Sequence, residues 1–213
     1  MPLIGNWRIK NINHCQLPIG NTLNKMAGGT TSILLKNFTE KDHVLLEKYL
    51  QEHSITNEKR THFWDIHTAH KKVKPHGKNK DLRPFIIEFH PKKSEFDDDP
   101  NNQTLIKNLG FSNTCGIDIA AMCNDKIDHV LQAELSLKFA EMFGGVIYLN
   151  GLITPSNAQN MTFEEVKNFA KSIKGTTHFA EYFLENGDKW ANQIVDVVYL
   201  KNWLKHADFR MIK

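Results

Sequence analysis

Ionisable side chains gather in one short stretch of the sequence, GIDIAAMCNDKIDH, which covers residues 116–129. Asp118 lies inside an apolar run, and Asp125, Asp128 and His129 follow where that run gives way to a helical pattern. Carboxylates beside an imidazole can act as general acid and base or hold a divalent cation. Ligand sites in open α/β sheets favour such strand ends. The set Asp118, Asp125, Asp128 and His129 is therefore a candidate active site for a small hydrolase or transferase.

The turn between the apolar run and the helical pattern, which we call the corner, also has a structural interpretation. Asn124 or Asp125 stands where a helix needs an N-cap oxygen, and Asp128 lies in the first turn, where the helix dipole favours negative charge. Asp118 would be costly to bury without a partner, so we expect it to face solvent or to pair with a basic residue. Cys123 and His129 could form a nucleophile pair, but the sequence shows no residue that would orient the imidazole of His129. We favour the capping interpretation over catalysis.

A second group of chemically capable residues is a run of histidines. His62, His67, His70 and His76 lie close together around Asp65. Imidazoles bind zinc, copper or nickel, which makes His67 and His70 the weak candidates for metal ligands. Their spacing matches no zinc signature. The sequence therefore predicts neither a bound metal nor a cofactor.

Two charged segments flank the strand predicted for residues 84–91. Residues 54–83 form a polar excursion rich in Lys, Arg and His, and residues 92–102 form an acidic loop. Basic residues near Phe63 and Trp64 suggest a nucleic-acid surface, but the acidic loop can neutralise it, so we disfavour nucleic acid. Charged loops on a rigid core suit electrostatically steered capture of a protein partner. The predicted partner-binding residues are Lys71, Lys72, Lys74, Glu95, Asp97, Asp98 and Asp99.

Hydrophobic patterning predicts the elements that must position these residues. The predicted strands cover residues 30–38, 84–91, 115–123, 146–154 and 193–200. The predicted helices cover residues 40–52, 101–109, 126–143, 162–173 and 178–187. Residues 115–153 read as a strand-helix-strand crossover unit. The sequence predicts one domain over residues 1–213, of the α+β or α/β class, with a single mixed sheet packed with several helices.

The N-terminal sequence, the cysteines and the net charge indicate the cellular compartment. Residues 1–15 lack the apolar run and cleavage site of a signal peptide, and no apolar run reaches membrane-spanning length. The three cysteines fit a reducing compartment. A net charge of +3 predicts no nucleic-acid partner by itself. We therefore expect a cytoplasmic protein without membrane contact.

Two stretches carry a resemblance to known proteins. They are GIDIAAMCNDKIDHVLQAELSLKFAEMFGGVIYLNGLI, residues 116–153, and WLKHADFRMIK, residues 203–213. Together they resemble a poorly characterised family of compact bacterial cytoplasmic proteins, of the kind that serve as immunity partners of polymorphic toxins. The resemblance implies a cognate protein toxin as partner and brings no catalytic residues. It leads to the hypothesis of an immunity protein that occludes a toxin's active site. The hydrolase or transferase and a nucleic-acid-binding accessory protein remain the alternatives.

Overall fold

Eight antiparallel strands form one sheet in the computed structural model, which describes residues 29–59, 63–69, 83–91, 115–183 and 187–211. The strand order is β2-β3-β4-β5-β1-β6-β8-β7. The strands are β1 (Thr30–Leu35), β2 (Thr56–Lys59), β3 (Phe63–Thr68), β4 (Arg83–His90), β5 (Cys115–Ala121), β6 (Val146–Tyr148), β7 (Thr177–Phe183) and β8 (Lys189–Val195). The predicted α+β class is confirmed, and the sheet predicted to be mixed is antiparallel in each of its pairings.

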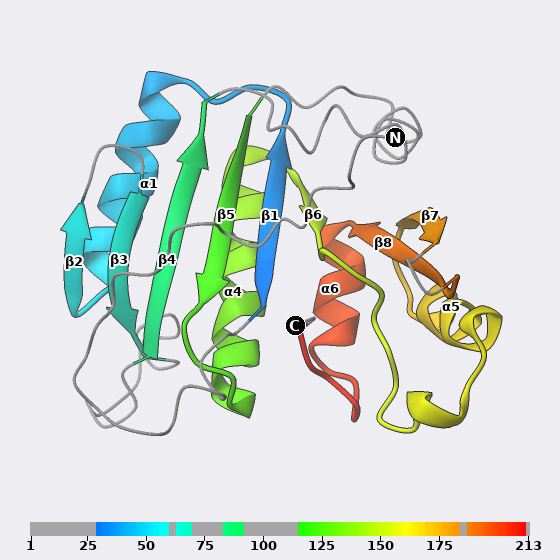
Figure 1. The fold of residues 1–213 in the computed structure, drawn as a ribbon. Coiled ribbons are helices and arrows are strands. Elements are labelled where there is room, and N and C mark those ends of the chain that lie inside the picture. Colours follow the sequence, from blue (N-terminus) through cyan, green and yellow to red (C-terminus); the bar gives the residue numbers. More distant parts are fainter. Residues whose placement is uncertain (1–28, 60–62, 70–82, 92–114, 184–186, 212–213) are drawn as a thin grey trace.

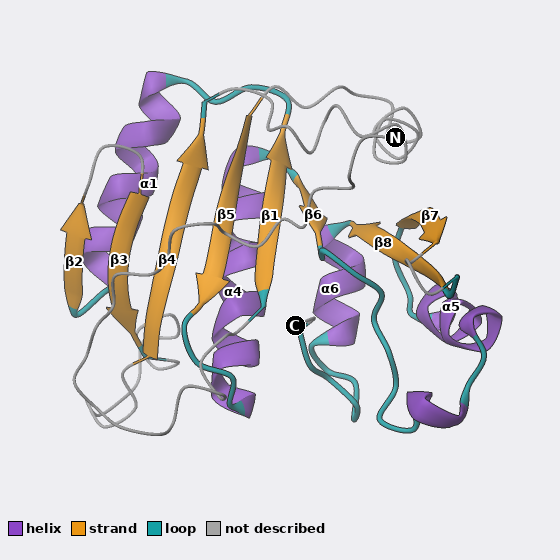
Figure 2. Ribbon diagram, viewed as in Figure 1, coloured by secondary structure: helices purple, strands orange, loops and turns teal. Residues whose placement is uncertain are grey.

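Four α-helices accompany the sheet in the described part of the chain. They are α1 (Glu40–His53), α4 (Lys126–Phe143), α5 (Phe163–Ser172) and α6 (Val197–Trp203), with a 3-10 turn at Ala158–Asn160. Figures 1 and 2 show α1 and α4 behind β1 to β5, so the viewer looks onto the opposite surface of these strands. We call this opposite surface the outer face. None of the described helices has the length and apolar character needed to span a bilayer.

Strand alternation separates the two faces of the sheet. Successive side chains of a strand point to opposite sides, and in β5 Ile117 and Ile119 are fully buried in the core that includes α4. Asp118 between them therefore points to the outer face. The same alternation directs Trp64 and Ile66 of β3 into the core. The helices thus cover the apolar face, and the outer face carries the acidic residues of these strands.

The predicted crossover unit is present, with one strand inserted. β5 and β6 both pair antiparallel with β1, so they run parallel to each other on either side of it. The connecting helix α4 is held to the sheet by buried polar groups. The Gln132 amide donates to the carbonyls of Gly29 (2.6 Å) and Ile119 (3.0 Å), and the hydroxyls of Ser136 and Thr31 lie 2.9 Å apart. These buried hydrogen bonds attach α4 to β5, to β1 and to the residue before β1.

Local signals set the helix ends as predicted. Thr39 with Asp42 and Thr162 with Glu165 form capping boxes at α1 and α5. Asp125 is the N-cap of α4, and Gly144 ends that helix in the left-handed conformation, with φ of 68°. The prediction for residues 126–143 is confirmed residue for residue.

The predicted polar excursion at residues 54–83 is wrong in part. β2 and β3 lie within it, and Trp64 is among the largest fully buried side chains. Residues 64–68 alternate between buried and more exposed positions. The sequence does not show this alternation clearly, because Thr68 is polar although it is buried. Because Trp64 is 1% exposed, it is not available to stack on a nucleic-acid base. The rest of this segment, the acidic loop and the helix predicted for 101–109 lie outside the described residues.

Of two further predictions near the C-terminus, one is wrong and the other holds only in part. Residues 178–187 were expected to form a helix, but Thr177–Phe183 is the strand β7. The strand predicted for 193–200 ends at Val195, because Asp196 caps α6 by accepting the backbone N–H of Tyr199 at 2.7 Å. A single capping side chain thus divides one apolar run between a strand and a helix.

Candidate functional site

The corner between β5 and α4 is organised by an arginine from another strand. Arg83, the first residue of β4, places Nη1 2.9 Å from Asp125 Oδ2 and Nε 3.7 Å from Asp128 Oδ1. The side chain of Asp128 is 1% exposed, and its Oδ2 accepts the backbone N–H of Asp125 at 2.7 Å. A carboxylate this buried needs a charged or hydrogen-bonding partner. Asp125 and Asp128 therefore hold the helix start and its link to β4.

The electrostatics of this corner make its thiol a poor nucleophile. Burial raises the pKa of Cys123, and Asp128 raises it further, while Arg83 acts in the opposite direction. Burial lowers the pKa of Arg83, but Asp128 and Asp125 outweigh burial and leave that pKa raised. A thiol whose pKa is raised is largely protonated and unreactive near neutral pH. The corner thus favours a fixed ion pair over covalent chemistry at Cys123.

His129 is directed to the C-terminal segment. Its Nδ1 accepts the backbone N–H of Met211 at 3.2 Å, and the residue is buried. This acceptor role requires that Nδ1 carries no proton. His129 therefore fastens residues near the end of the chain to the first turn of α4.

Asp118 lies apart from the other three predicted catalytic residues. It points to the outer face, whereas Asp128 and His129 belong to the helix that covers the other face. Asp118 Oδ2 lies 3.0 Å from His90 Nε2, and Glu88 Oε2 lies 4.0 Å from the same nitrogen. The expected pairing of Asp118 with a basic residue is confirmed. The structure brings Asp125 and Asp128 together with Arg83 and does not bring Asp118 into that group.

Four carboxylates of the outer face form two cross-strand pairs, which are offset by two residues because Asp65 faces Ile86 and Glu88 faces Phe63. Strand register sets Glu58 of β2 directly opposite Asp65 of β3, and Glu88 of β4 directly opposite Asp118 of β5. Glu58 and Glu88 are exposed, and Asp65 and Asp118 are half-buried. We call Glu58, Asp65, Glu88 and Asp118 the acidic stripe. Like charges directly opposite each other on neighbouring strands disfavour a sheet unless a cation compensates them, and His90 lies beside both Glu88 and Asp118.

His90 makes the stability of this face depend on pH. The hydrogen bond to Asp118 raises the pKa of His90 despite its burial, and the charges of Asp118 and Glu88 add to the effect. A raised pKa gives a stabilising contribution that is complete below the unfolded pKa of about 6.5 and disappears as pH rises through the folded value. We expect His90→Gln to lower the free energy of unfolding more at about pH 5.5 than at about pH 8.5.

Urea unfolding at both pH values measures this difference. An Asp118→Asn background supplies the control, because it removes the main partner of the imidazolium. In that background the effect of His90→Gln should lose most of its pH dependence. An equal loss of stability at both pH values in the wild-type background would contradict the assigned ion pair.

The remaining predicted site residues divide into two groups. His67 lies in β3 as an exposed residue, and the part of the chain that the structure describes contains no group of three or more side chains arranged to hold a metal ion. The other metal candidate and the predicted partner-binding residues lie outside the described residues, and their roles stay predictions. They are His70, Lys71, Lys72, Lys74, Glu95, Asp97, Asp98 and Asp99.

Sequence reasoning missed Arg83, Glu88 and His90. All three lie in β4, where Glu88 and His90 alternate with Ile87 and Phe89. That alternation indicates which residues share the outer face. It does not indicate that Glu88 lies opposite Asp118, because strand register between distant segments is absent from the local pattern.

Comparison with known proteins adds a family and no activity. The model of a family of unknown function, DUF6368, matches residues 27–213. The match spans both the corner and the acidic stripe. Among curated proteins and solved structures, no match is found. The resemblance to immunity proteins thus stays a prediction.

Proposed function

The chain belongs to the DUF6368 family of unknown function, and from the charges on its sheet we propose that it is a binding protein of the bacterial immunity type. In this proposal it captures a cognate protein toxin and occludes the toxin's active site. The toxin offers a basic surface to the outer face of the sheet. The protein acts in the cytoplasm, where a toxin would meet its target.

The acidic stripe is the observation that carries this proposal. Two pairs of carboxylates stand directly opposite each other in register, Glu58 with Asp65 and Glu88 with Asp118. These carboxylates concentrate negative charge on the outer face, and a basic partner surface would complement it. Complementary charge also accelerates encounter with the partner and disfavours wrong partners. The net charge of +3 for the whole chain does not oppose this, because short-range capture depends on the local face.

The same geometry weighs against the two alternatives. A catalytic set of Asp118, Asp125, Asp128 and His129 would have to draw on both faces of the sheet, with Asp128 engaged by Arg83 and His129 by Met211. A nucleic-acid ligand would meet carboxylates on the outer face, and phosphate groups are repelled there. Capture of a basic protein surface requires neither a catalytic group nor a phosphate-binding one.

The test uses the protein encoded by the gene directly adjacent to this one as the probe. Co-expression should restore growth of cells that produce the probe, and purified chains should associate. We expect Glu88→Lys to slow association several-fold at low salt and less at high salt, because screening weakens the contribution of exposed charges.

Glu52→Lys is the matched control, since it makes the same charge change at an exposed position of α1, behind the sheet. It should leave the association rate near that of wild type. An unchanged rate for Glu88→Lys, or an equal loss for Glu52→Lys, would place the interface away from the acidic stripe. Failure of the wild-type chain to bind or protect would reject the adjacent gene product as its partner.

A further inference from the structure

The outer face continues beyond the acidic stripe onto β1 and β6, where its side chains become apolar. Residues directly opposite each other on neighbouring strands share a face of the sheet. Ser32 of β1 lies opposite Asp118 of the acidic stripe, and Tyr148 of β6 lies opposite Ser32. Leu34, two residues after Ser32, points the same way because strand side chains alternate. Leu34 and Tyr148 therefore lie on the outer face.

The same register carries the outer face across β8 to β7. Ile194 of β8 lies opposite Tyr148, and His178 of β7 lies opposite Ile194. Ala180, two residues after His178, shares this face. The apolar residues of this half of the outer face form one hydrophobic cluster, which we call the outer cluster: Leu34, Tyr148, Ala180 and Ile194.

The outer cluster is deeply buried. Ile194 is 1% exposed, Tyr148 4%, and Leu34 and Ala180 5% each. A sheet face that is left to solvent carries polar side chains, whereas a face that buries apolar side chains packs against a second layer. The outer cluster therefore requires a layer above it.

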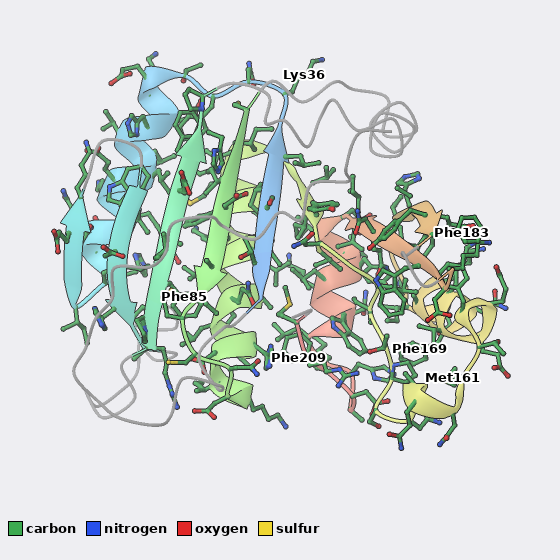
Figure 3. The ribbon with its side chains drawn as sticks, viewed as in Figure 1. Lys36, Phe85, Met161, Phe169, Phe183 and Phe209 are labelled. Carbon is green, nitrogen blue, oxygen red and sulfur yellow. The ribbon has the colours of Figure 1, made fainter. Side chains whose placement is uncertain are left out.

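The described helices lie on the other side of these strands. Val195 of β8 and Phe179 of β7 alternate with the outer-face residues, and they belong to the apolar clusters that contain residues of α6 and α5, respectively. Phe169 of α5 meets Trp203 of α6 on this side, with the ring centroids 6.0 Å apart (Figure 3). Among the described residues, the apolar neighbour packed against the outer cluster is Val146, which lies on the same face. The layer above the cluster therefore comes from another part of the chain.

The segment that precedes β1 begins beside the outer cluster. Residues 1–28 lead into Gly29, whose carbonyl accepts the backbone N–H of Ala121 at 3.2 Å and the Gln132 amide at 2.6 Å. These bonds fix one end of the segment at β1, which contributes Leu34 to the cluster. The three strand spacings from β1 to β7 measure about 14 Å, which a segment extending about 3.3 Å per residue crosses easily.

The composition of residues 1–28 also suits the outer face. The segment contains no Asp or Glu, so it can lie beside Asp118 without charge repulsion. Arg8, Lys10 and Lys25 give it the opposite charge. It is also rich in large apolar residues that can cover the cluster. These are Leu3, Ile4, Trp7, Ile9, Ile12, Leu17, Ile19, Leu23 and Met26.

The other long segments outside the described residues fit this face less well. Residues 92–114 contain the acidic run 97–99, which the carboxylates of the outer face repel. Residues 70–82 are basic, but Val73 and Leu82 are their only large aliphatic residues. Residues 1–28 combine apolar character with positive charge.

We propose that residues 1–28 pack across the outer cluster and form a layer on the outer face of the sheet. The apolar side chains of the segment cover the cluster, and its basic side chains lie toward Asp118. Glu58 and Glu88, on the half that carries the acidic stripe, are exposed and remain available to a partner. The proposal concerns the free chain, so its test is separate from that of toxin capture.

Photo-crosslinking within the full chain tests the position of the segment. Trp7→p-benzoylphenylalanine places a photoreactive aromatic side chain in it, and irradiation joins that side chain to its nearest neighbour. Tandem mass spectrometry of crosslinked single chains should locate the bond on outer-face residues of β1, β6, β7 or β8. The same substitution at Val44, an exposed residue of α1 behind the sheet, should give no bond to these residues. Crosslinks from position 7 that map elsewhere, or none within the chain, overturn the proposal.

Exposure of the outer cluster supplies a second measurement. Ile4→Ser/Trp7→Ser/Ile9→Ser should uncover the cluster and raise the fluorescence of a neutral apolar dye such as Nile red several-fold, because such dyes bind exposed apolar surface. Circular dichroism should show that the sheet is intact. Leu105→Ser/Ile106→Ser is the matched control, since it makes the same kind of change in residues 92–114, and it should leave the dye signal unchanged. A rise for the control that equals or exceeds that of the N-terminal variant contradicts the proposal, as does no rise for either.

Discussion

Arg83→Ala is expected to lower the free energy of unfolding by about 3 kcal/mol, because it leaves a buried carboxylate without its charged partner. The side chain of Asp128 is 1% exposed and Arg83 is the cation that faces it, while Asp125 meets the same guanidinium from a largely exposed position. Urea unfolding followed by circular dichroism measures the loss. In a chain of this size it corresponds to a fall of roughly 6–12 °C in melting temperature.

Two variants separate the buried ion pair from the helix cap. Asp125→Ala removes the N-cap side chain and should cost about 1 kcal/mol. Asp128→Asn in the Arg83→Ala background should recover part of the loss, because a neutral amide still accepts the backbone N–H of Asp125. If Arg83→Ala costs no more than Asp125→Ala, then Asp128 does not depend on the arginine and the account of the corner is wrong.

Gly175→Ala should be at least as damaging, with an expected loss of about 3 kcal/mol or more from strain and overpacking together. Gly175 connects α5 to β7 with φ of 134°, a region that L-residues rarely adopt. A Cβ atom there would lie 2.3 Å from the backbone nitrogen of Tyr199 and 2.4 Å from its Cα. These are backbone atoms of α6, so relief requires that the whole helix moves.

Gly144→Ala is the matched control for Gly175→Ala. Gly144 also has positive φ, 68°, but a Cβ atom there would have nothing within 4 Å. The only cost left is that of placing an L-residue in the left-handed backbone conformation, which is about 1 kcal/mol. Thermal unfolding of both variants gives the comparison. Equal losses at the two positions would show that α6 yields easily to the added methyl group.

The parts of this fold that local chemistry sets were predictable. Thr39, Thr162 and Gly144 end or begin helices through contacts within a few residues, so their positions follow from the sequence. β7 was predicted as a helix because Phe179, Tyr182 and Phe183 are spaced three and four residues apart, as on a helix face. The strand forms because β8 lies beside it along its whole length. Tertiary pairing thus overrides an ambiguous local pattern.

The candidate site was harder to predict than the fold. Asp125 and Asp128 were identified as a helix start, but Arg83, which organises them, comes from a strand distant in sequence. Asp118 was grouped with them because it is near in sequence, although the side-chain period of a strand sends it to the outer face beside His90. Proximity along the chain is a poor guide to proximity in space across a sheet, where register decides which side chains meet.

The place of β1 in the sheet has a consequence for the order of assembly. β1 is the first described strand in sequence, and both of its neighbours, β5 and β6, come much later in the chain. The hydroxyls of Thr31 and Ser136, which join β1 to α4, are 105 residues apart. During synthesis β1 therefore emerges long before β5 and β6, its neighbours among the described strands. Closing so long a loop costs chain entropy before any contact compensates it, which places folding among the slow, high-contact-order cases. The apolar strand Ile33-Leu34-Leu35 lacks both of its neighbours for that interval, and apolar segments left unpaired during folding are prone to aggregate.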